Sequence, residues 1–360
     1  MKPTQALHEL GQSLWLDNIT RDILDNGTLR RYVDELSVTG LTSNPTIFDE
    51  AIGGGATYDA AIQKKAGAGL SGEDLFLEIA LEDLRRAADI FRPIYDKTDG
   101  NDGWVSMEVS PLLASDTKAT IASALKIHKA ADRPNLYVKI PGTPEGVPAI
   151  EEAIFAGVPV NVTLLFSREQ YLAVAEAYMR GLERRKAASL SLRVNSVASV
   201  FVSRWDRAVA DKVPEDLRNK LGIAICLRTY KAHCDLIASK RWKDLEAGGA
   251  RKQRMLWAST GVKDPKAPAD LYVSAFAAPE TIDTMPEKTL LAFAENGAVK
   301  GVIPKDGGDA EDVLKRFEKA GIDVKALADK LQVDGAESFV KSWTELMKRI
   351  ADKSKALAKS

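Results

Sequence analysis

One lysine, Lys139, stands inside the apolar, β-branched segment Leu136–Ile140. Such a segment is typical of a buried strand, where an ammonium group is costly to bury. Burial favours the neutral amine, which is the nucleophile of enzymes that form Schiff bases with carbonyl substrates. The structural alternative is a lysine at a sheet edge whose ammonium reaches water. Which alternative holds depends on the polar residues that the fold brings to Lys139.

Polar residues also end, or directly follow, most of the other apolar segments. They are carboxylates, amides and hydroxyls, and the main ones are Asp17, Asn44, Glu108, Asn161, Thr163, Ser199 and Ser259. Each alone could serve packing, because most buried polar groups belong to satisfied hydrogen-bond networks. Their recurrence at the same end of successive predicted strands favours a shared site.

This set of residue types suits carbonyl chemistry. An amine that attacks a carbonyl needs a proton donor to expel water and a base to move protons during bond cleavage. Asp17 and Glu108 could take these two roles. Metal catalysis is disfavoured, because His8, His128 and His233 lie in helical stretches away from the strand ends. We therefore predict a Schiff-base enzyme that uses neither a metal nor another cofactor.

A candidate phosphate site follows the sixth apolar segment, at Ser199–Arg204. The free N–H groups and the dipole at the start of a helix attract anions. Arg204, one turn into the expected helix, could offer a bidentate guanidinium to a phosphate. An ordinary surface arginine is the alternative. The segment thus points to a phosphorylated substrate.

Short apolar segments alternate with longer amphipathic ones along the chain. The short segments predict strands at Leu14–Asp17, Val38–Thr42, Trp104–Val109, Leu136–Ile140, Val158–Thr163, Leu192–Val197, Met255–Ala258 and Thr281–Thr284. Alternation of strand and helix implies a parallel sheet, and eight such units imply a single α/β domain, a (β/α)8 TIM barrel with extra helices. A doubly wound open sheet is the alternative, but no glycine-rich dinucleotide motif follows any predicted strand.

The end of the chain is expected to form one further helix. Apolar residues at helical spacing follow Gly335: Phe339, Trp343, Leu346, Ile350 and Leu357. We expect residues 1–335 to form the barrel and residues 336–360 to form a helix that packs across it within the same domain.

Composition narrows the class of protein. The chain has 360 residues, of which 45% are hydrophobic and 28% charged, with a formal net charge of -1. This balance is typical of globular proteins and does not favour nucleic acid as a partner. No long uncharged apolar run could span a membrane, and the first residues lack the apolar core of a signal peptide. Cys226 and Cys234 are expected to be buried structural thiols, so a cytoplasmic location is predicted.

Two segments resemble signatures of the transaldolase family. Leu136–Gly146 matches the family's active-site lysine pattern, and Gly40–Thr46 matches a second signature apart from Leu41, where the family usually has Ile, Val, Ser or Ala. Trp15–Arg21 and Leu256–Lys263 are similar to the longer bacterial subgroup. The resemblance covers nearly the whole chain. It implies a cofactor-free enzyme of the pentose phosphate pathway that transfers a dihydroxyacetone unit from a ketose phosphate to an aldose phosphate.

The resemblance also implies roles for single residues. Lys139 would attack the C2 carbonyl of fructose 6-phosphate or sedoheptulose 7-phosphate. Glu108 and Thr163 would hold the water used in proton transfer during imine formation. Asp17 would act as general base on the C4 hydroxyl and return the proton to the incoming aldehyde, glyceraldehyde 3-phosphate or erythrose 4-phosphate.

The remaining implied residues bind substrate. Asn44 and Asn161 would hold the three-carbon unit, and Ser199 with Arg204 would bind phosphate. Phe201 occupies a position where transaldolases have phenylalanine and related fructose-6-phosphate aldolases have tyrosine. Ser259 and Lys263 are expected near the phosphate, where many transaldolases have a second arginine; a lysine is not its geometric equivalent.

Two other functions remain open at this stage. One is an aldolase that releases free dihydroxyacetone, and the other is a catalytically silent protein that binds sugar phosphates. Phe201 disfavours the first, and the intact Asp17, Glu108 and Lys139 set disfavours the second. The expected partners are small sugar phosphates, with the chain acting as a monomer or a homodimer.

Overall fold

The computed structural model describes residues 1–358, and within them eight parallel strands form one sheet in the order β2-β1-β8-β7-β6-β5-β4-β3. The strands are β1 (Ser13–Asp17), β2 (Val38–Thr42), β3 (Val105–Glu108), β4 (Leu136–Pro141), β5 (Val160–Leu165), β6 (Ser196–Phe201), β7 (Arg254–Ala258) and β8 (Ile282–Met285). The N–H of Leu41 donates to the carbonyl of Trp104 at 3.0 Å, which joins the two end strands. The sheet therefore closes, and the predicted (β/α)8 barrel is confirmed.

The prediction for the sixth strand was wrong by four residues at each end. The strand was expected at Leu192–Val197 and lies at Ser196–Phe201. The strand begins with Ser196 and contains Ser199, and both hydroxyls have polar partners: Ser196 donates to the carbonyl of Val160, and Ser199 donates to Asn161. These hydroxyls interrupt the apolar pattern, so hydrophobicity alone favoured the residues that precede the strand.

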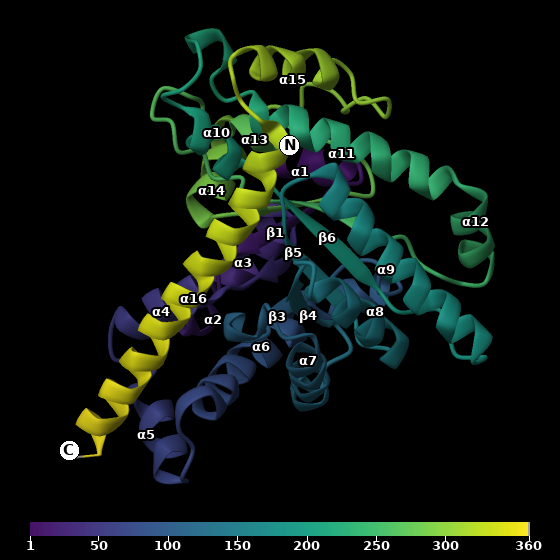
Figure 1. Cartoon of the computed structure of the whole chain (residues 1–360). Helices are drawn as coiled ribbons and strands as arrows, with labels where there is room; N and C mark the ends of the chain where they lie inside the picture. The colour runs from purple at the N-terminus through teal and green to yellow at the C-terminus, as the bar shows by residue number, and fades with distance from the viewer. Residues whose placement is uncertain (359–360) are drawn as a thin grey trace.

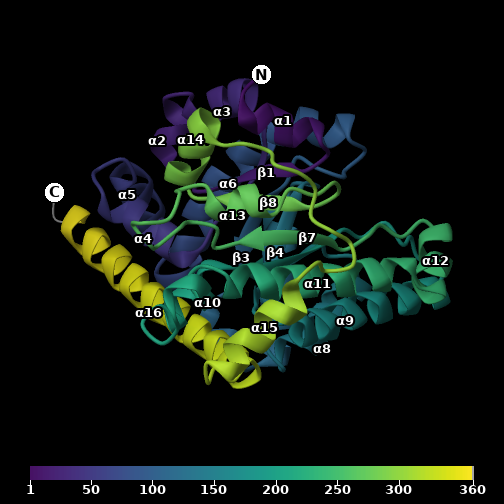
Figure 2. The same cartoon turned by 90° about the horizontal axis from the view of Figure 1, so that it is seen from above.

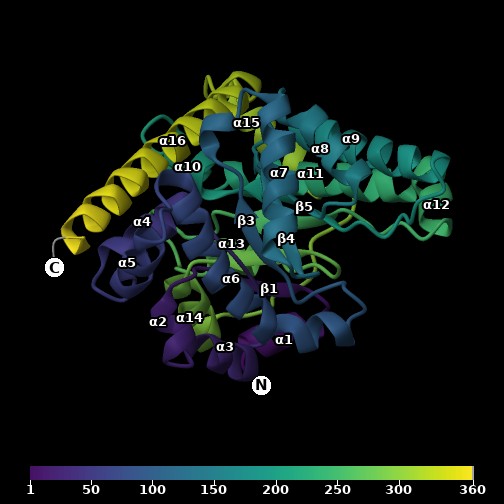
Figure 3. The ribbon, with the colours of Figure 1, turned by 90° about the horizontal axis from the view of Figure 1, so that it is seen from below.

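Helices surround the strands, as the views from above and below show (Figures 2 and 3). From the first half of the chain come α1 (Pro3–Glu9), α2 (Arg21–Asp25), α3 (Thr28–Leu36), α4 (Pro45–Gly53), α5 (Asp59–Gly67), α6 (Gly72–Lys97), η1 (Pro111–Leu113), α7 (Thr117–Ala131), α8 (Gly146–Ala156) and α9 (Arg168–Ala187). From the second half come α10 (Ser203–Val209), η2 (Glu215–Leu217), α11 (Leu221–Ala238), α12 (Lys240–Ala247), α13 (Leu271–Ala275), α14 (Glu287–Asn296), α15 (Ala310–Lys319) and α16 (Val324–Leu357). No helix within residues 1–358 is both long and apolar enough to cross a membrane.

The last helix, α16, crosses the molecule diagonally and packs against α4, α5 and α6 (Figure 1). It begins at Val324, earlier than expected, because the carboxylate of Asp323 accepts from the N–H of Ala326 and caps it. Gly335 lies inside this helix rather than before it. The side-chain amide of Gln332 donates at 2.9 Å to the carbonyls of both Gly142 and Leu164. These bonds fasten α16 to the residue that follows β4 and to the backbone near the end of β5. Residues 359 and 360 of the predicted tail lie outside the described part.

Candidate active site

A cavity opens at the carboxyl ends of the strands and contains Lys139. It is lined by Asp17, Thr42, Asn44, Lys139, Thr163, Ser199, Phe201, Arg204, Ala258, Ser259, Thr284 and Phe339. Most residues predicted for the site belong to this set. Glu108 and Asn161 lie directly behind it, in contact with Lys139 and Ser199 respectively. The mouth of the barrel thus gathers side chains from strands that are far apart in the sequence, as the fold predicts.

Lys139 forms a buried ion pair with Glu108. The two residues pair in register on β4 and β3, and Nζ lies 3.0 Å from Glu108 Oε2. Nζ also donates to the carbonyl of Ser43 at 3.2 Å. Only 7% of the Lys139 side chain and 6% of the Glu108 side chain are exposed, so the sheet-edge alternative is wrong. Burial raises the pKa of Glu108, and the nearby Lys139 opposes this rise.

Asp17 belongs to a different hydrogen-bond system. Its Oδ1 accepts from the hydroxyl of Thr42 at 2.7 Å. Burial raises the pKa of Asp17, and both the charge of Lys139 and the bond from Thr42 oppose this rise. The two carboxylates therefore have separate partners, one an ammonium and the other a hydroxyl. Two carboxylates in different surroundings can perform different proton transfers in one reaction.

Amides and hydroxyls complete the polar lining. Asn161 is fully buried; its amide donates to Ser106 Oγ at 3.1 Å, and its carbonyl accepts from Ser199 at 2.7 Å. Asn44 caps α4, because its carbonyl accepts from the N–H of Ile47 at 3.1 Å. Its NH2 group stays available to a ligand. Thr163 Oγ1 is buried without a hydrogen-bond partner in the described part of the chain, as suits an atom that holds a water or a substrate oxygen.

Arg204 is the cation of the cavity that carries no ion pair within residues 1–358. Its guanidinium carbon lies 5.3 Å from the ring centre of Phe201 and 5.7 Å from that of Phe339. Burial lowers the pKa of Arg204, so the site does not fully compensate its charge. Strand β6 extends to Phe201, so α10 begins only at Ser203, and it is a helix of 7 residues. The case for an anion at this position therefore rests on Arg204 rather than on a helix start.

Helix α16 supplies the apolar cover of the cavity. The ring centre of Phe339 lies 5.5 Å from Lys139 Nζ, and the ring is 7% exposed. One turn earlier, a Cβ atom on Gly335 would lie 2.9 Å from Leu164 Cδ2 and 3.1 Å from Arg204 Nη1. A side chain at this position would displace the ends of the Leu164 and Arg204 side chains. The glycine thus leaves room for the guanidinium of Arg204 beneath α16.

The structure separates Ser259 from Lys263. Ser259 lines the cavity, adopts a left-handed φ of 58°, and its hydroxyl lies 2.9 Å from that of Ser203. Lys263 instead lines a neighbouring cavity with Arg207, Arg218 and Asp264. Lys263 does not line the cavity of Lys139, so its role at the phosphate stays a prediction.

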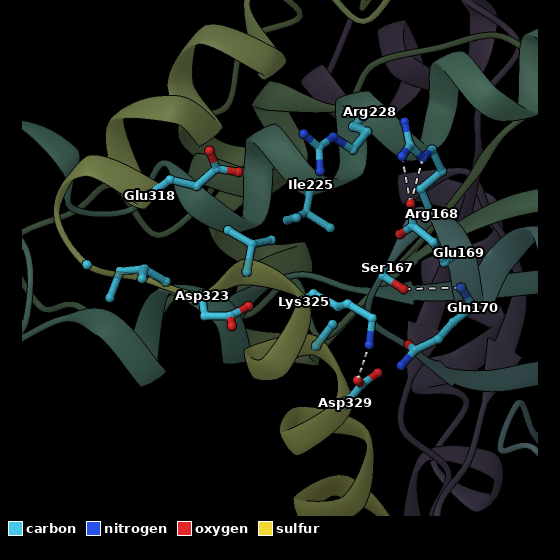
Figure 4. A pocket seen from close by; sticks show the side chains of 14 residues that line it. Ser167, Arg168, Glu169, Gln170, Ile225, Arg228, Glu318, Asp323, Lys325 and Asp329 are labelled. Carbon is cyan, nitrogen blue, oxygen red and sulfur yellow. Dashed lines mark hydrogen bonds and ion pairs between the residues drawn. The ribbon is translucent and has the colours of Figure 1, made fainter.

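Other parts of the described chain offer weaker sites. The three histidines lie on α1, α7 and α11, and residues 1–358 contain no group of three His, Cys, Asp or Glu side chains suited to a metal. A wider pocket lies between α9, α11, α15 and the start of α16 (Figure 4). Most of its charged side chains pair with each other or with neighbours: Arg168 with Glu169, Lys325 with Asp329, and Arg228 with Glu311. None of its lining residues belongs to the cavity of Lys139.

Four residues that line the cavity were not predicted as site residues: Thr42, Ala258, Thr284 and Phe339. Thr42 ends β2 and Thr284 lies one residue before the end of β8, so the strand-end rule that found Asn44 could have found both. Phe339 was identified only as part of an apolar stripe. No sequence signal gives the path of α16, so its place over Lys139 could not be inferred.

The chain is similar to proteins of known family over nearly its whole length. The family model for transaldolase/fructose-6-phosphate aldolase matches residues 14–350. A transaldolase of Thermobifida fusca is 43% identical over 358 residues, covering 97% of each chain. A transaldolase of Saccharopolyspora erythraea is 44% identical over 355 residues, covering 97% of this chain and 96% of its own. The barrel with a buried lysine at its mouth therefore belongs to the transaldolase/fructose-6-phosphate aldolase family.

Proposed function

We propose that the protein is a transaldolase that moves a dihydroxyacetone unit between sugar phosphates of the non-oxidative pentose phosphate pathway. The donor would be sedoheptulose 7-phosphate or fructose 6-phosphate, and the acceptor glyceraldehyde 3-phosphate or erythrose 4-phosphate. The observation that carries the proposal is the buried pair of Lys139 and Glu108 at the barrel mouth. Relatives that bear the name transaldolase support the same reaction.

The first stage forms an imine. Glu108 accepts a proton from the ammonium, and the neutral amine of Lys139 attacks the C2 carbonyl of the donor. The new C–N bond gives a carbinolamine, whose oxygen leaves as water after it is protonated. Glu108 lies 3.0 Å from Nζ, and Thr163 Oγ1 has no protein partner, so both suit the placing of a water that carries these protons.

The second stage breaks the bond between C3 and C4. Asp17 removes the proton of the C4 hydroxyl, an aldose phosphate leaves, and the electron pair moves into the imine to form an enamine. The acceptor aldehyde then adds by the reverse path, and Asp17 returns the proton. Water hydrolyses the resulting imine, which breaks the C–N bond and releases the new ketose phosphate and the amine of Lys139. Because Asp17 bonds to Thr42 and not to Lys139, it can act as a separate base, although the nearby charge of Lys139 lowers its pKa.

The remaining polar residues would bind the sugar chain. The free amide hydrogens of Asn44 and the buried Asn161–Ser199 pair suit hydroxyls of the three-carbon unit. The uncompensated charge of Arg204 suits the phosphate. Ser259 lies at the same end of the cavity, next to Ser203. The two free cysteines of the described chain fit a cytoplasmic enzyme, and monomer or homodimer stays a prediction.

Borohydride trapping tests this assignment. Reduction in the presence of fructose 6-phosphate should attach the three-carbon unit to Lys139, as peptide mass spectrometry would show. Lys139→Ala should lose turnover but keep its fold by circular dichroism, and Lys263→Gln should still form the adduct. An adduct on another lysine would refute the mechanism. Release of free dihydroxyacetone at the full rate without an acceptor would identify an aldolase instead.

A further inference from the structure

Three side chains from adjacent strands form a hydrogen-bonded chain that ends at Asp17. Thr42 Oγ1 on β2 lies 2.7 Å from Asp17 Oδ1 on β1, and Thr284 Oγ1 on β8 lies 2.7 Å from Thr42 Oγ1. Strands β2 and β8 are the two neighbours of β1 in the sheet. The two threonine hydroxyls therefore meet from either side of the strand that carries the carboxylate.

The direction of these bonds follows from the number of hydrogens. A hydroxyl has one hydrogen to donate, and an ionised carboxylate can only accept. Thr42 must give its hydrogen to Asp17, so Thr284 must be the donor to Thr42. Each hydroxyl then has one defined orientation as long as Asp17 is ionised.

Thr284 is itself held in place. Its side chain is 3% exposed, and its backbone carbonyl accepts from the hydroxyl of Thr260 at 2.9 Å. It also lines the cavity, yet the reaction described above gives it no role. A buried hydroxyl fixed by a neighbouring strand limits the rotation of the next hydroxyl along the chain.

We propose that Thr284 is a positioning residue for bond cleavage, which fixes the hydroxyl of Thr42 on Asp17 Oδ1 and so leaves Oδ2 directed to the substrate. The proposal rests on the proposed function, because it assigns Asp17 the proton of the C4 hydroxyl. Thr284 would not touch the reacting atoms. It would act through Thr42 and would serve cleavage but not imine formation.

The pH dependence of cleavage distinguishes a positioning role of Thr284 from a merely structural one, which would leave that dependence unchanged. The bond from Thr42 lowers the pKa of Asp17 against the effect of burial, so a less ordered Thr42 lets that pKa rise. The charged groups that face Asp17 are Lys139, which also lowers its pKa, and Glu108, whose own pKa rises beside Asp17. Neither Lys139 nor Glu108 has a hydrogen bond to Thr284 in the described part of the chain. The pH at which the cleavage rate falls on the acid side should therefore report on the pair of Thr42 and Thr284.

The test compares Thr284→Val, which keeps the shape, with Thr284→Ser, which keeps the hydroxyl. For Thr284→Val we expect single-turnover release of the aldose phosphate to slow about tenfold, with its acid limb moved to higher pH. Borohydride trapping of the imine should keep its wild-type rate. Thr284→Ser should restore both the cleavage rate and the pH profile.

A double-mutant cycle with Thr42→Val guards against misfolding of a single variant. If Thr284 acts through Thr42, adding Thr284→Val to Thr42→Val should cost no further rate. Additive effects, an unchanged pH profile, or equal slowing of trapping and cleavage would overturn the role of Thr284. Failure of the wild-type enzyme to trap any adduct would instead contradict the proposed function.

Discussion

Glu108 and Lys139 hold paired positions on neighbouring strands, and 3.0 Å separates the carboxylate Oε2 from the ammonium Nζ. Both are buried, so each depends on the other for its charge balance. We expect Glu108→Gln to slow imine formation by about 10²–10⁴-fold, the usual effect of losing a general acid or base. The rate of borohydride-trappable adduct measures this. Equal loss in Asp17→Ala would contradict the separate roles of the carboxylates.

The same pair predicts an effect on stability. Removing one partner of a buried ion pair costs about 3–5 kcal/mol, because the other charge stays buried without compensation. Glu108→Gln should therefore unfold at lower urea concentration than the wild type. The double variant Glu108→Gln/Lys139→Met should recover much of this loss, since it leaves no charge behind. A double variant less stable than Glu108→Gln would show that the pair stabilises the fold on balance.

Asp283 on β8 predicts a pH dependence of stability. It is fully buried, neither carboxyl oxygen has a hydrogen-bond partner in the described part of the chain, and burial raises its pKa from 3.8 to about 8. Between pH 3.8 and about 8 the folded state keeps a proton on Asp283 that the unfolded state has released. The stability that Asp283 contributes at low pH is therefore lost as the pH rises through this range. The non-ionising Asp283→Asn should gain stability over the wild type from pH 5 to pH 8 in urea unfolding. A difference that stays constant with pH would argue against this account.

Arg204 and Lys263 form a matched pair of cations, one inside the cavity and one outside it. Arg204→Gln removes a charge-assisted contact to phosphate, which should raise KM for fructose 6-phosphate about 10–100-fold. Arg204→Lys should recover only part of this, because an ammonium lacks the bidentate geometry. Lys263→Gln should change KM less than twofold, roughly the effect of an ordinary surface charge. Steady-state kinetics decides; a large effect at Lys263 would support its predicted role.

The position of Phe339 over Lys139 predicts how much of the enamine is protonated by water rather than transferred to an acceptor. The ring covers Lys139 and helps exclude water, which would protonate the enamine and release dihydroxyacetone instead of passing it to an acceptor. Phe339→Ala should raise the fraction of turnovers that release dihydroxyacetone, and Phe339→Leu should raise it less because it keeps more apolar bulk. Parallel assays of both products measure this fraction. An unchanged fraction in Phe339→Ala would show that the ring only packs.

The surroundings of Gly335 predict that Gly335→Ala brings no gain in stability, although helix propensity alone would favour alanine. Alanine in a helix interior is better than glycine by about 1 kcal/mol. Here, however, the new Cβ would approach Arg204 Nη1 to 3.1 Å and Leu164 Cδ2 to 2.9 Å. Gly335→Ala should raise KM for sugar phosphates and yield no gain in thermal stability. Gly67→Ala, at a helical glycine with open space around it, is the control that should leave KM unchanged.

Much of the fold could be read from the sequence because strand and helix alternate with clear periodicity. The strand-end rule found Asp17, Asn44 and Lys139, since parallel strands of a barrel bring their carboxyl ends together whatever the loops do. It does not reach Lys263, which was assigned from the family resemblance and lies beyond the left-handed turn at Ser259. The direction of the chain after such a turn is a local backbone property that residue types do not specify. The position of Phe339 likewise depends on how α16 docks as a whole.

Helix α16 follows all eight strands in the sequence. A ribosome finishes all eight strands before the 34 residues of this helix emerge, so a nascent barrel can hold Lys139 and Glu108 before Phe339 and Gln332 exist. In such a barrel the amine of Lys139 would lack the apolar cover that Phe339 provides. Control over which carbonyl compounds reach the lysine would therefore depend on the docking of α16.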